Sequence, residues 1–505
     1  MNQLLPPGIT TDYTVRKLVT AFIDNTFLPA GSGILLPVVY PATESQVSEV
    51  EESGPEVVDL AVRAARRAFA RGPWPHLEVA ERQAALRRVA ALLRQHAREL
   101  AYLECLNSGI PMRHLALGQI PRAALNFEFF AEFIGQTSGQ IYSQDSRYLT
   151  LVTREPVGVA ALIGPWNAPL ALTSMKIAAC IAFGNCCVVK PAEQTPLAVA
   201  RLMDLITEAG IPPGVVNMVG GRGTTTGDAL VRHPEINLVS FTGGTGTGRT
   251  VMERAGAGLK PCSLELGGKS ANIVFASADF ERALDGALLG IFSNNGQQCL
   301  AGSRILVERS IAPDFIQAFV ARATKLRVGD PMDPTTEIGP LAYRAHFERV
   351  LSYVEVARAE GAQLLMGGGR AIGFERGFYM QPTAVQVADN RGRVCQEEVF
   401  GPFATFMTFD SVDEAIAIAN DSRFGLISYI WSEHLPTALR ASRAMHSGVV
   451  WVNTPMVREL RAPFGGLKDS GMGREGGQAS MQFYTAEKST TIAVGAVPMA
   501  RLGLG

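Results

Sequence analysis

Residues 157–167 read Val-Gly-Val-Ala-Ala-Leu-Ile-Gly-Pro-Trp-Asn, an apolar run that ends in a turn. The run predicts a buried strand, and the apolar stretch at 169–183 predicts the helix that follows it. The alternation continues, with strands expected at 186–189, 215–219 and 238–241 and helices expected at 196–209, 225–232 and 245–257. Short apolar strands that alternate with helices indicate a parallel sheet, in which ligands bind at the carboxyl ends of the strands. The polar, glycine-rich turns of this block fall at those ends.

The segments on either side of this block fit the same α/β class. Helices are expected at 56–72 and 78–101, and an exposed strand is expected at 148–153. A second set of strands and helices is expected from about residue 272 to 466, and the alternating stretch 489–494 predicts an edge strand.

Composition excludes several classes of function. The 505 residues include 46 Lys+Arg and 47 Asp+Glu, so the net charge of −1 is far from the basic excess that a nucleic acid or an acidic membrane surface would require. The seven cysteines are odd in number and include no Cys-x-x-Cys pair, and no His-Glu-x-x-His occurs, so neither a disulfide scaffold nor a metal site is expected. The apolar run at 168–183 is too short for a membrane span and contains Lys176. Residues 1–20 do not resemble a secretory signal, and a soluble cytoplasmic protein is expected.

Three glycine-rich segments are candidates for phosphate binding. Phe241-Thr-Gly-Gly-Thr-Gly-Thr-Gly248 follows a predicted strand and opens a predicted helix, so its backbone amides could hold a pyrophosphate; a tight turn without a ligand fits the local sequence equally well. The glycines at 471, 473 and 476 have dinucleotide-fingerprint spacing but no strand–turn–helix context, and we interpret them as a loop. Gly-Gly-Lys-Ser at 267–270 lacks the earlier glycine of a phosphate loop.

Two side chains are candidates for catalysis on local grounds. Cys299 follows the polar segment Asn294-Asn-Gly-Gln-Gln298, whereas most other cysteines lie in apolar or helical runs. An exposed loop suits a nucleophilic thiolate with a lowered pKa, although a lone cysteine is more often a small core residue. Glu265 ends an apolar strand between two leucines, where it could be a desolvated base or a solvent-facing edge residue.

Seven motifs occur in order along the chain. They are Pro165-Trp-Asn167, Lys190-Pro-Ala-Glu193, Phe241-Thr-Gly243, Glu265-Leu-Gly-Gly268, Gly296-Gln-Gln-Cys299, Glu398-Val-Phe-Gly-Pro402 and Pro463-Phe-Gly-Gly466. Together they resemble the aldehyde dehydrogenase superfamily over about residues 40–484. The resemblance implies a Rossmann-type NAD-binding domain at 1–135 and 157–266 and an α/β catalytic domain at 267–466. It also implies a small β oligomerisation element and tail at 136–156 and 467–505, and a homodimer or homotetramer.

The resemblance also implies roles for individual residues. Cys299 would be the nucleophile, Glu265 the general base, and Asn167 a partner of the Cys299 amide in an oxyanion hole. Lys190 and Glu193 would hold the adenosine ribose, and a carboxylate there favours NAD over NADP. Glu398 would bind the nicotinamide ribose, and Phe400 would pack near the nicotinamide ring. Lys176 would lie near the active site. The other cofactor-binding residues that the resemblance implies are Ile163, Gly164, Pro165, Trp166, Gly223, Gly227, Gly243, Gly244, Thr245 and Leu266. Many relatives carry Ser and then Glu or Ala where this chain has Gly244 and Gly246, so the phosphate turn is expected to rely on its backbone.

The substrate is suggested by two further segments. Residues 120–131 and 457–466 resemble the hydroxymuconic semialdehyde dehydrogenase branch, which includes the 5-carboxymethyl-2-hydroxymuconate enzymes of aromatic catabolism. The resemblance implies that Arg122 and Arg461 hold a substrate carboxylate, with Arg458 as a lesser candidate. Alternatively, these arginines pair with acids such as Glu128 or Glu459 and brace the fold, and the substrate is a neutral aromatic or aliphatic aldehyde. A non-catalytic structural protein on the same scaffold is the alternative from a different class.

Overall fold

A parallel sheet forms the centre of the first lobe. The computed structural model describes residues 13–143 and 145–503. The sheet has eight strands in the order β22-β12-β11-β8-β9-β10-β2-β3. Its parallel strands are β8 (Val159–Ile163), β9 (Cys186–Lys190), β10 (Val216–Met218), β11 (Leu238–Thr242) and β12 (Cys262–Glu265). Every residue of β8, β9, β10 and β11 is buried, as expected for a sheet covered on both faces.

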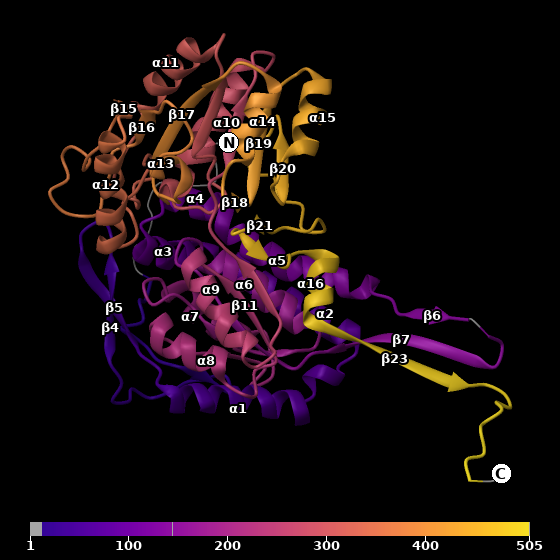
Figure 1. The fold of residues 1–505 in the computed structure, drawn as a ribbon. Helices are drawn as coiled ribbons and strands as arrows, with labels where there is room; N and C mark the ends of the chain where they lie inside the picture. The colour runs from indigo at the N-terminus through magenta and orange to yellow at the C-terminus, as the bar shows by residue number, and fades with distance from the viewer. Residues whose placement is uncertain (1–12, 144, 504–505) are drawn as a thin grey trace.

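Helices cover this sheet as the alternation predicted (Figure 1). The crossover helices are α6 (Pro169–Ala182), α7 (Leu197–Glu208), α8 (Asp228–Arg232) and α9 (Thr245–Gly256), and the chain before them forms α1 (Pro55–Arg71), α2 (Val79–Gln95), α3 (Ala97–Ser108) and α5 (Ile120–Phe133). The single helix expected at 78–101 is wrong: the chain breaks at His96 (φ −96°, ψ 17°), and α3 continues to Ser108. The apolar periodicity does not reveal this break, because α2 and α3 each bury one face and the apolar spacing continues across His96.

A second sheet forms the other lobe, at the top of Figure 1. Its order is β15-β16-β17-β14-β13-β19-β20, and only β15 is antiparallel to its neighbour. The strands are β13 (Ala271–Val274), β14 (Arg304–Glu308), β15 (Gln363–Met366), β16 (Thr383–Gln386), β17 (Phe403–Phe409), β19 (Ile427–Trp431) and β20 (Val449–Val452). The helices are α10 (Phe280–Phe292), α11 (Ala312–Ala323), α12 (Arg344–Ala359), α13 (Arg393–Gln396), α14 (Val412–Asn420) and α15 (Leu435–Ala444).

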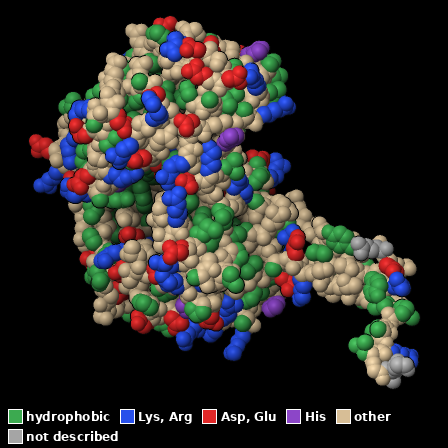
Figure 2. Space-filling view, in the orientation of Figure 1, with side chains coloured by type: hydrophobic (Ala, Val, Ile, Leu, Met, Phe, Trp, Pro, Cys, Tyr) green, Lys and Arg blue, Asp and Glu red, His purple; other side chains and the backbone are tan. Residues whose placement is uncertain are grey.

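A three-stranded sheet projects from the body (Figures 1 and 2). It consists of β6 (Gln140–Tyr142), β7 (Tyr148–Pro156) and β23 (Thr485–Ala493), in the order β23-β7-β6. We call these strands the arm. The tail enters the arm only at Thr485, later than the boundary expected at residue 467.

The residues between 467 and 484 belong to the body instead. Strand β21 (Leu467–Lys468) pairs with β18 (Phe424–Gly425), and β22 (Gly471–Met472) extends the first sheet beside β12. Helix α16 (Gly477–Tyr484) then leads to the arm. The glycines of the fingerprint-like spacing therefore form an edge strand and loop, not a dinucleotide turn. In the described part of the chain, no helix is both long and apolar enough to cross a membrane.

Candidate active site

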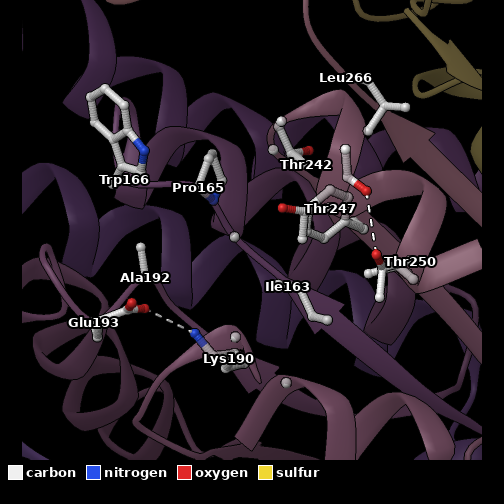
Figure 3. A pocket seen from close by; sticks show the side chains of 18 of the residues that line it. Ile163, Pro165, Trp166, Lys190, Ala192, Glu193, Thr242, Thr247, Thr250 and Leu266 are labelled. Atoms are coloured by element: carbon white, nitrogen blue, oxygen red, sulfur yellow. Dashed lines mark hydrogen bonds and ion pairs between the residues drawn. The ribbon is translucent and has the colours of Figure 1, made fainter. Parts of the chain in front are cut away.

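A cavity of about 1250 Å³ lies at the carboxyl ends of β8, β9 and β11 and is closed by residues of the second lobe. Ligand pockets usually measure about 300–1,000 Å³, so this one can hold a large ligand such as a dinucleotide. Its lining includes Ile163, Gly164, Pro165, Trp166, Asn167, Lys190, Glu193, Gly223, Gly227, Gly243, Gly244, Glu265, Leu266, Cys299, Glu398 and Phe400. The structure thus brings together most of the side chains that the motifs selected. Figure 3 shows one part of this cavity.

A buried lysine and a carboxylate meet where β9 ends. The Nζ of Lys190 donates to Pro191 O at 3.1 Å and lies 3.4 Å from Glu193 Oε2, the pair joined by a dashed line in Figure 3. Burial lowers the pKa of Lys190. A Cβ on Gly227 would lie 3.7 Å from the Cδ of Lys190, so a larger residue at this position would add a side chain to the wall of the cavity. Glu193 has acceptor oxygens for hydroxyl groups and would repel a phosphate.

The turn between β11 and α9 presents bare backbone to the cavity. Gly244 caps α9, no side chain bonds to the free amides of the helix, and a Cβ on Gly244 or Gly246 would meet open space. These features fit an anion at a helix N-terminus. The side chains of Thr242, Thr247 and Thr250 bring hydroxyl groups to this region (Figure 3); the first two lie in the 241–248 segment, but no role was expected for any of the three. Thr245 does not line the cavity, since its hydroxyl donates to Asp469 O at 3.2 Å.

Glu398 and two aromatic rings line the part of the cavity near Cys299. The Oε1 of Glu398 accepts from the Gly268 amide at 2.9 Å, and burial raises the pKa of Glu398 to about 7. Phe400 packs edge-on against Trp166, with 5.2 Å between ring centroids. An apolar wall beside a fixed carboxylate suits a flat ring that carries a hydroxylated group.

The loop that carries Cys299 is irregular and held by side-chain amides. Asn294 and Asn295 adopt left-handed backbone angles (φ 54° and 57°), and Gly296 has φ 72° with Gly401 so close that a Cβ would stand 2.2 Å from its carbonyl carbon. The Nδ2 of Asn167 donates to Gln297 O at 2.9 Å. Because an amide nitrogen has two hydrogens, Asn167 keeps one donor for a second acceptor in the cavity.

The expectation of a low-pKa thiol in an exposed loop is wrong for Cys299. Its side chain is partly buried, and burial together with the charges of Glu398 and Glu265 raises the pKa of the thiol to about 12. Arg122 acts in the opposite direction but is outweighed. The thiol is therefore protonated at neutral pH in this state of the site. The polar local sequence could not reveal the two carboxylates, which come from distant segments.

Glu265 is buried and does not face solvent. Its side chain is 5% exposed, and within the described residues neither carboxylate oxygen has a hydrogen-bond partner. Burial, with the charge of Glu475, raises the pKa of Glu265 well above its usual value, while Lys176 opposes the shift. Lys176 does not line the cavity: its Nζ donates to Glu475 at 2.7 Å and to Ser240 at 3.0 Å. A desolvated, unpaired carboxyl beside a cavity is suited to proton transfer.

The three candidate arginines lie in different surroundings. Arg461 is exposed, and its guanidinium pairs with Glu459 at 2.9 Å, so the bracing alternative holds for this residue. Arg458 is partly buried, lies over the Phe464 ring at 4.3 Å and, within the described chain, donates only to a backbone carbonyl, Glu475 O at 3.3 Å. The loop turns Arg461 outward and Arg458 inward, and the role of either residue in holding a substrate carboxylate stays a prediction.

Arg122 shares the surroundings of Arg458. Burial lowers the pKa of both guanidinium groups, and Arg122 contributes to the shift of Arg458. Among the described residues neither has a carboxylate within ion-pair distance, and the Nε of each is buried without a partner. Glu128, the acid considered for Arg122, pairs with Arg94 instead.

The motifs also missed cavity residues on α12 and on the rim. Tyr343, His346 and Arg349 line the cavity, as do Arg222 and Arg254. No motif marked these residues; His346 and Arg349 lie on α12, and Tyr343 immediately precedes it. Among the described residues, no group of three or more His, Cys, Asp or Glu side chains is placed to hold a metal ion.

Comparison with known proteins identifies the family. The model of the aldehyde dehydrogenase family matches residues 27–490. A 5-carboxymethyl-2-hydroxymuconate semialdehyde dehydrogenase from Escherichia coli is 45% identical over 86% of this chain and 93% of its own length, and human retinal dehydrogenase 2 is 40% identical over 95% and 92%. An NAD⁺ complex of an aldehyde dehydrogenase from Bacillus cereus superposes with a TM-score of 0.92 at 39% identity, covering 94% of this chain and 97% of that one. The chain therefore belongs to the aldehyde dehydrogenase family.

The raised pKa of Cys299 leads to a prediction about thiol reactivity without cofactor. We expect the rate at which iodoacetamide alkylates Cys299 to rise about tenfold per pH unit from pH 7 to about pH 9 without reaching a plateau, because only the thiolate reacts. Peptide mass spectrometry at timed intervals would measure the rate. A plateau below about pH 8 would show that the resting thiol is acidic and would contradict the prediction.

Proposed function

We propose that this NAD-dependent aldehyde dehydrogenase oxidises an aldehyde that also bears a carboxylate, such as a semialdehyde of aromatic-compound catabolism. The observation that carries the proposal is the pair Arg122 and Arg458, two partly buried arginines whose Nε atoms are buried without a partner and which have no carboxylate within ion-pair distance in the described chain. The similarity to the Escherichia coli semialdehyde enzyme agrees with it. The similarity to a dehydrogenase named for retinal, a neutral aldehyde, shows that family membership alone does not decide the charge of the substrate.

Electrostatics around Glu265 favour an anionic substrate. Lys176, Arg458 and Arg474 all lower the pKa of Glu265, and Arg122 acts on the adjacent Cys299 thiol. Four carboxylates, Glu265, Glu475, Glu398 and Glu459, act against these four cations, so an anion is favoured by the two guanidinium groups that have no ion-pair partner in the described chain. A buried region with unpaired guanidinium groups is costly unless an anion compensates it, and a planar carboxylate can accept two bonds from a guanidinium.

The cavity residues fit NAD. The carboxylate of Glu193 beside Lys190 would hold the adenosine ribose and disfavour a 2′-phosphate, the bare N-terminus of α9 would hold the pyrophosphate, and Glu398 with Phe400 would hold the nicotinamide ribose and ring. When bound, NAD accepts the hydride that the aldehyde carbon loses. In this assignment the NAD-binding domain comprises residues 1–135 and 157–266, and the catalytic domain comprises residues 267–466.

The proposed chemistry begins at Cys299. The Cys299 thiol gives its proton to solvent, and the thiolate sulfur bonds to the aldehyde carbon while the carbonyl π pair moves to the oxygen. The negatively charged oxygen of the adduct then accepts hydrogen bonds from the second N–H of the Asn167 amide and from the Cys299 backbone N–H, an arrangement in which one donor typically contributes about 2.7–4 kcal/mol to the transition state. After hydride loss the product is a thioester on Cys299.

Glu265 completes the cycle. Its carboxylate takes a proton from water, the water oxygen bonds to the thioester carbon, and the C–S bond breaks to release the acid and the thiolate. Because burial raises the pKa of Glu265, its carboxylate is a stronger base than a solvated one. Both Glu265 and Cys299 act in their deprotonated forms and both have raised pKa values, so activity should increase as the pH rises.

Variants of the two reacting groups test the mechanism. We expect Cys299→Ala to abolish turnover, since no thioester can form. We expect Glu265→Gln to release about one equivalent of NADH in a burst and then turn over slowly, since acylation survives while hydrolysis fails. Stopped-flow absorbance of NADH would measure both. Full steady-state activity in either variant would overturn the assignment.

Arginine variants test the substrate proposal. Arg122→Met and Arg458→Met should each lower kcat/KM for a carboxylated semialdehyde by about 10–100-fold, because a charge-assisted hydrogen bond contributes about 1.5–3 kcal/mol. For benzaldehyde, kcat/KM should fall much less, so the ratio of the two values is the readout. Arg461→Met is the matched control, since its guanidinium is exposed and paired. If the ratio is unchanged in both buried variants, the carboxylate proposal fails.

We also propose that the arm joins two or four copies of the chain. Ile141, Tyr142 and Ile492 are 66%, 51% and 44% exposed on it, and the outer edges of β6 and β23 have no strand partner in the described chain. Unpaired edges with apolar side chains favour association.

The arm proposal predicts a native mass of a dimer or tetramer. Ile141→Asp combined with Ile492→Asp should shift the sedimentation coefficient towards that of a monomer, because charges would be buried at the contact. Leu435→Asp, which changes an exposed residue on the distant α15, is the matched control. A wild-type monomer would contradict the proposal.

A further inference from the structure

One face of α12 bonds to the backbone of the segment that carries Glu398 and Phe400. The Nε2 of His346 lies 2.7 Å from Phe400 O, and because a carbonyl can only accept, Nε2 carries the hydrogen. The guanidinium of Arg349 donates to Glu398 O at 2.6 Å and to Val399 O at 3.4 Å. Three consecutive carbonyls thus find donors on one helix.

The same helix also binds the segment through a side chain. The hydroxyl of Tyr353 donates to Glu397 Oε2 at 2.8 Å. His346, Arg349 and Tyr353 are three and four residues apart, so they lie on one side of α12. We call these three residues the α12 clamp.

The clamped segment has an unfavourable backbone conformation. Phe400 has φ 62°, a left-handed angle that costs a non-glycine residue of order 1–3 kcal/mol. The segment lies between the short helix α13 and strand β17, so regular secondary structure does not hold its carbonyls. The hydrogen bonds from the clamp compensate for this, and without them the segment has more favourable conformations available.

The clamp also connects two walls of the cavity. The ring of His346 lies 4.9 Å from that of Trp166 and 5.9 Å from that of Phe400. Trp166 comes from the turn after β8, in the first lobe, whereas Phe400 and α12 belong to the second. His346 therefore packs against both aromatic walls, whose rings also contact each other at 5.2 Å, and burial keeps His346 neutral by lowering its pKa to about 4.

We propose that the α12 clamp positions Glu398 and Phe400 for the nicotinamide half of the dinucleotide and leaves the binding of its adenosine half unaffected. The inference rests on the proposed NAD site. It assigns His346, Arg349 and Tyr353 as positioning residues for cofactor binding. The adenosine half would bind at Lys190, Glu193 and the N-terminus of α9, none of which the clamp contacts through a hydrogen bond in the described chain.

The test compares NADH, which has both halves, with ADP, which has only the adenosine half. We expect His346→Leu and Arg349→Met to weaken the binding of NADH by at least about tenfold, the effect of about 1.4 kcal/mol, and to change the Kd of ADP by less than about twofold. NADH fluorescence titration and calorimetry with ADP would measure the two affinities without any turnover. His346→Gln, whose amide can still donate to Phe400 O, should restore most of the NADH affinity.

Arg358→Met is the matched control for the helix. Arg358 lies on α12 but pairs only with Glu355, at 2.6 Å, on the exposed surface. Neither affinity should change in this variant. If His346→Leu does not fold, Arg349→Met and His346→Gln still give the comparison.

Several outcomes would overturn the inference. Equal losses of NADH and ADP affinity would show a general structural defect, or, in Arg349→Met alone, a direct contact of the guanidinium with phosphate. Unchanged NADH affinity in both variants would show that the clamp has no role in binding. If the wild-type protein bound neither ligand, the proposed NAD site itself would be wrong, which is a different result from a failure of the clamp alone.

Discussion

The site depends on a buried loop that has no regular secondary structure and must satisfy its backbone in another way. Asn295 is fully buried, and its side chain donates to Gly109 O and Pro340 O, both at 3.0 Å, and accepts from the Gly339 amide at 2.8 Å. One side chain thus bridges the end of α3 in the first lobe and a segment of the second. An unpaired buried amide or carbonyl costs about 1–3 kcal/mol, so these bonds hold the loop, and with it Cys299, against both lobes.

The chemistry of the site is the result of burying charges of both signs in one place. Glu265 and Cys299 have raised pKa values because they lie out of water and close to further carboxylates. The cations on the other side limit this effect: Lys176 pairs with Glu475, whereas Arg122 and Arg458 have no carboxylate within ion-pair distance in the described chain. The pKa of the Cys299 thiol is thus determined by charged groups from other segments and not by its own polar loop.

Local patterns predicted the positions of residues that follow strands. Lys190, Glu193 and the Gly243-Gly244 turn each come directly after a buried parallel strand, and such ends meet at one edge of the sheet, so their convergence in one cavity followed from strand order alone. Local patterns did not predict the orientation of side chains in irregular loops. Arg458 and Arg461 are three positions apart in one irregular segment, and nothing in their neighbours shows which one turns inward.

The sequence by itself determined the α/β class, the family, and many but not all of the residues around the cavity, because apolar periodicity and ordered motifs are properties of the chain read locally. Only the tertiary structure decided which arginine is buried, how acidic the Cys299 thiol is, and that α12 bonds to the segment of Glu398. These properties depend on groups that are distant in the sequence, such as His346 and Phe400, which are 54 positions apart, or on irregular backbone. Desolvation and Coulomb interactions depend on distances in space, which cannot be read from separations along the sequence.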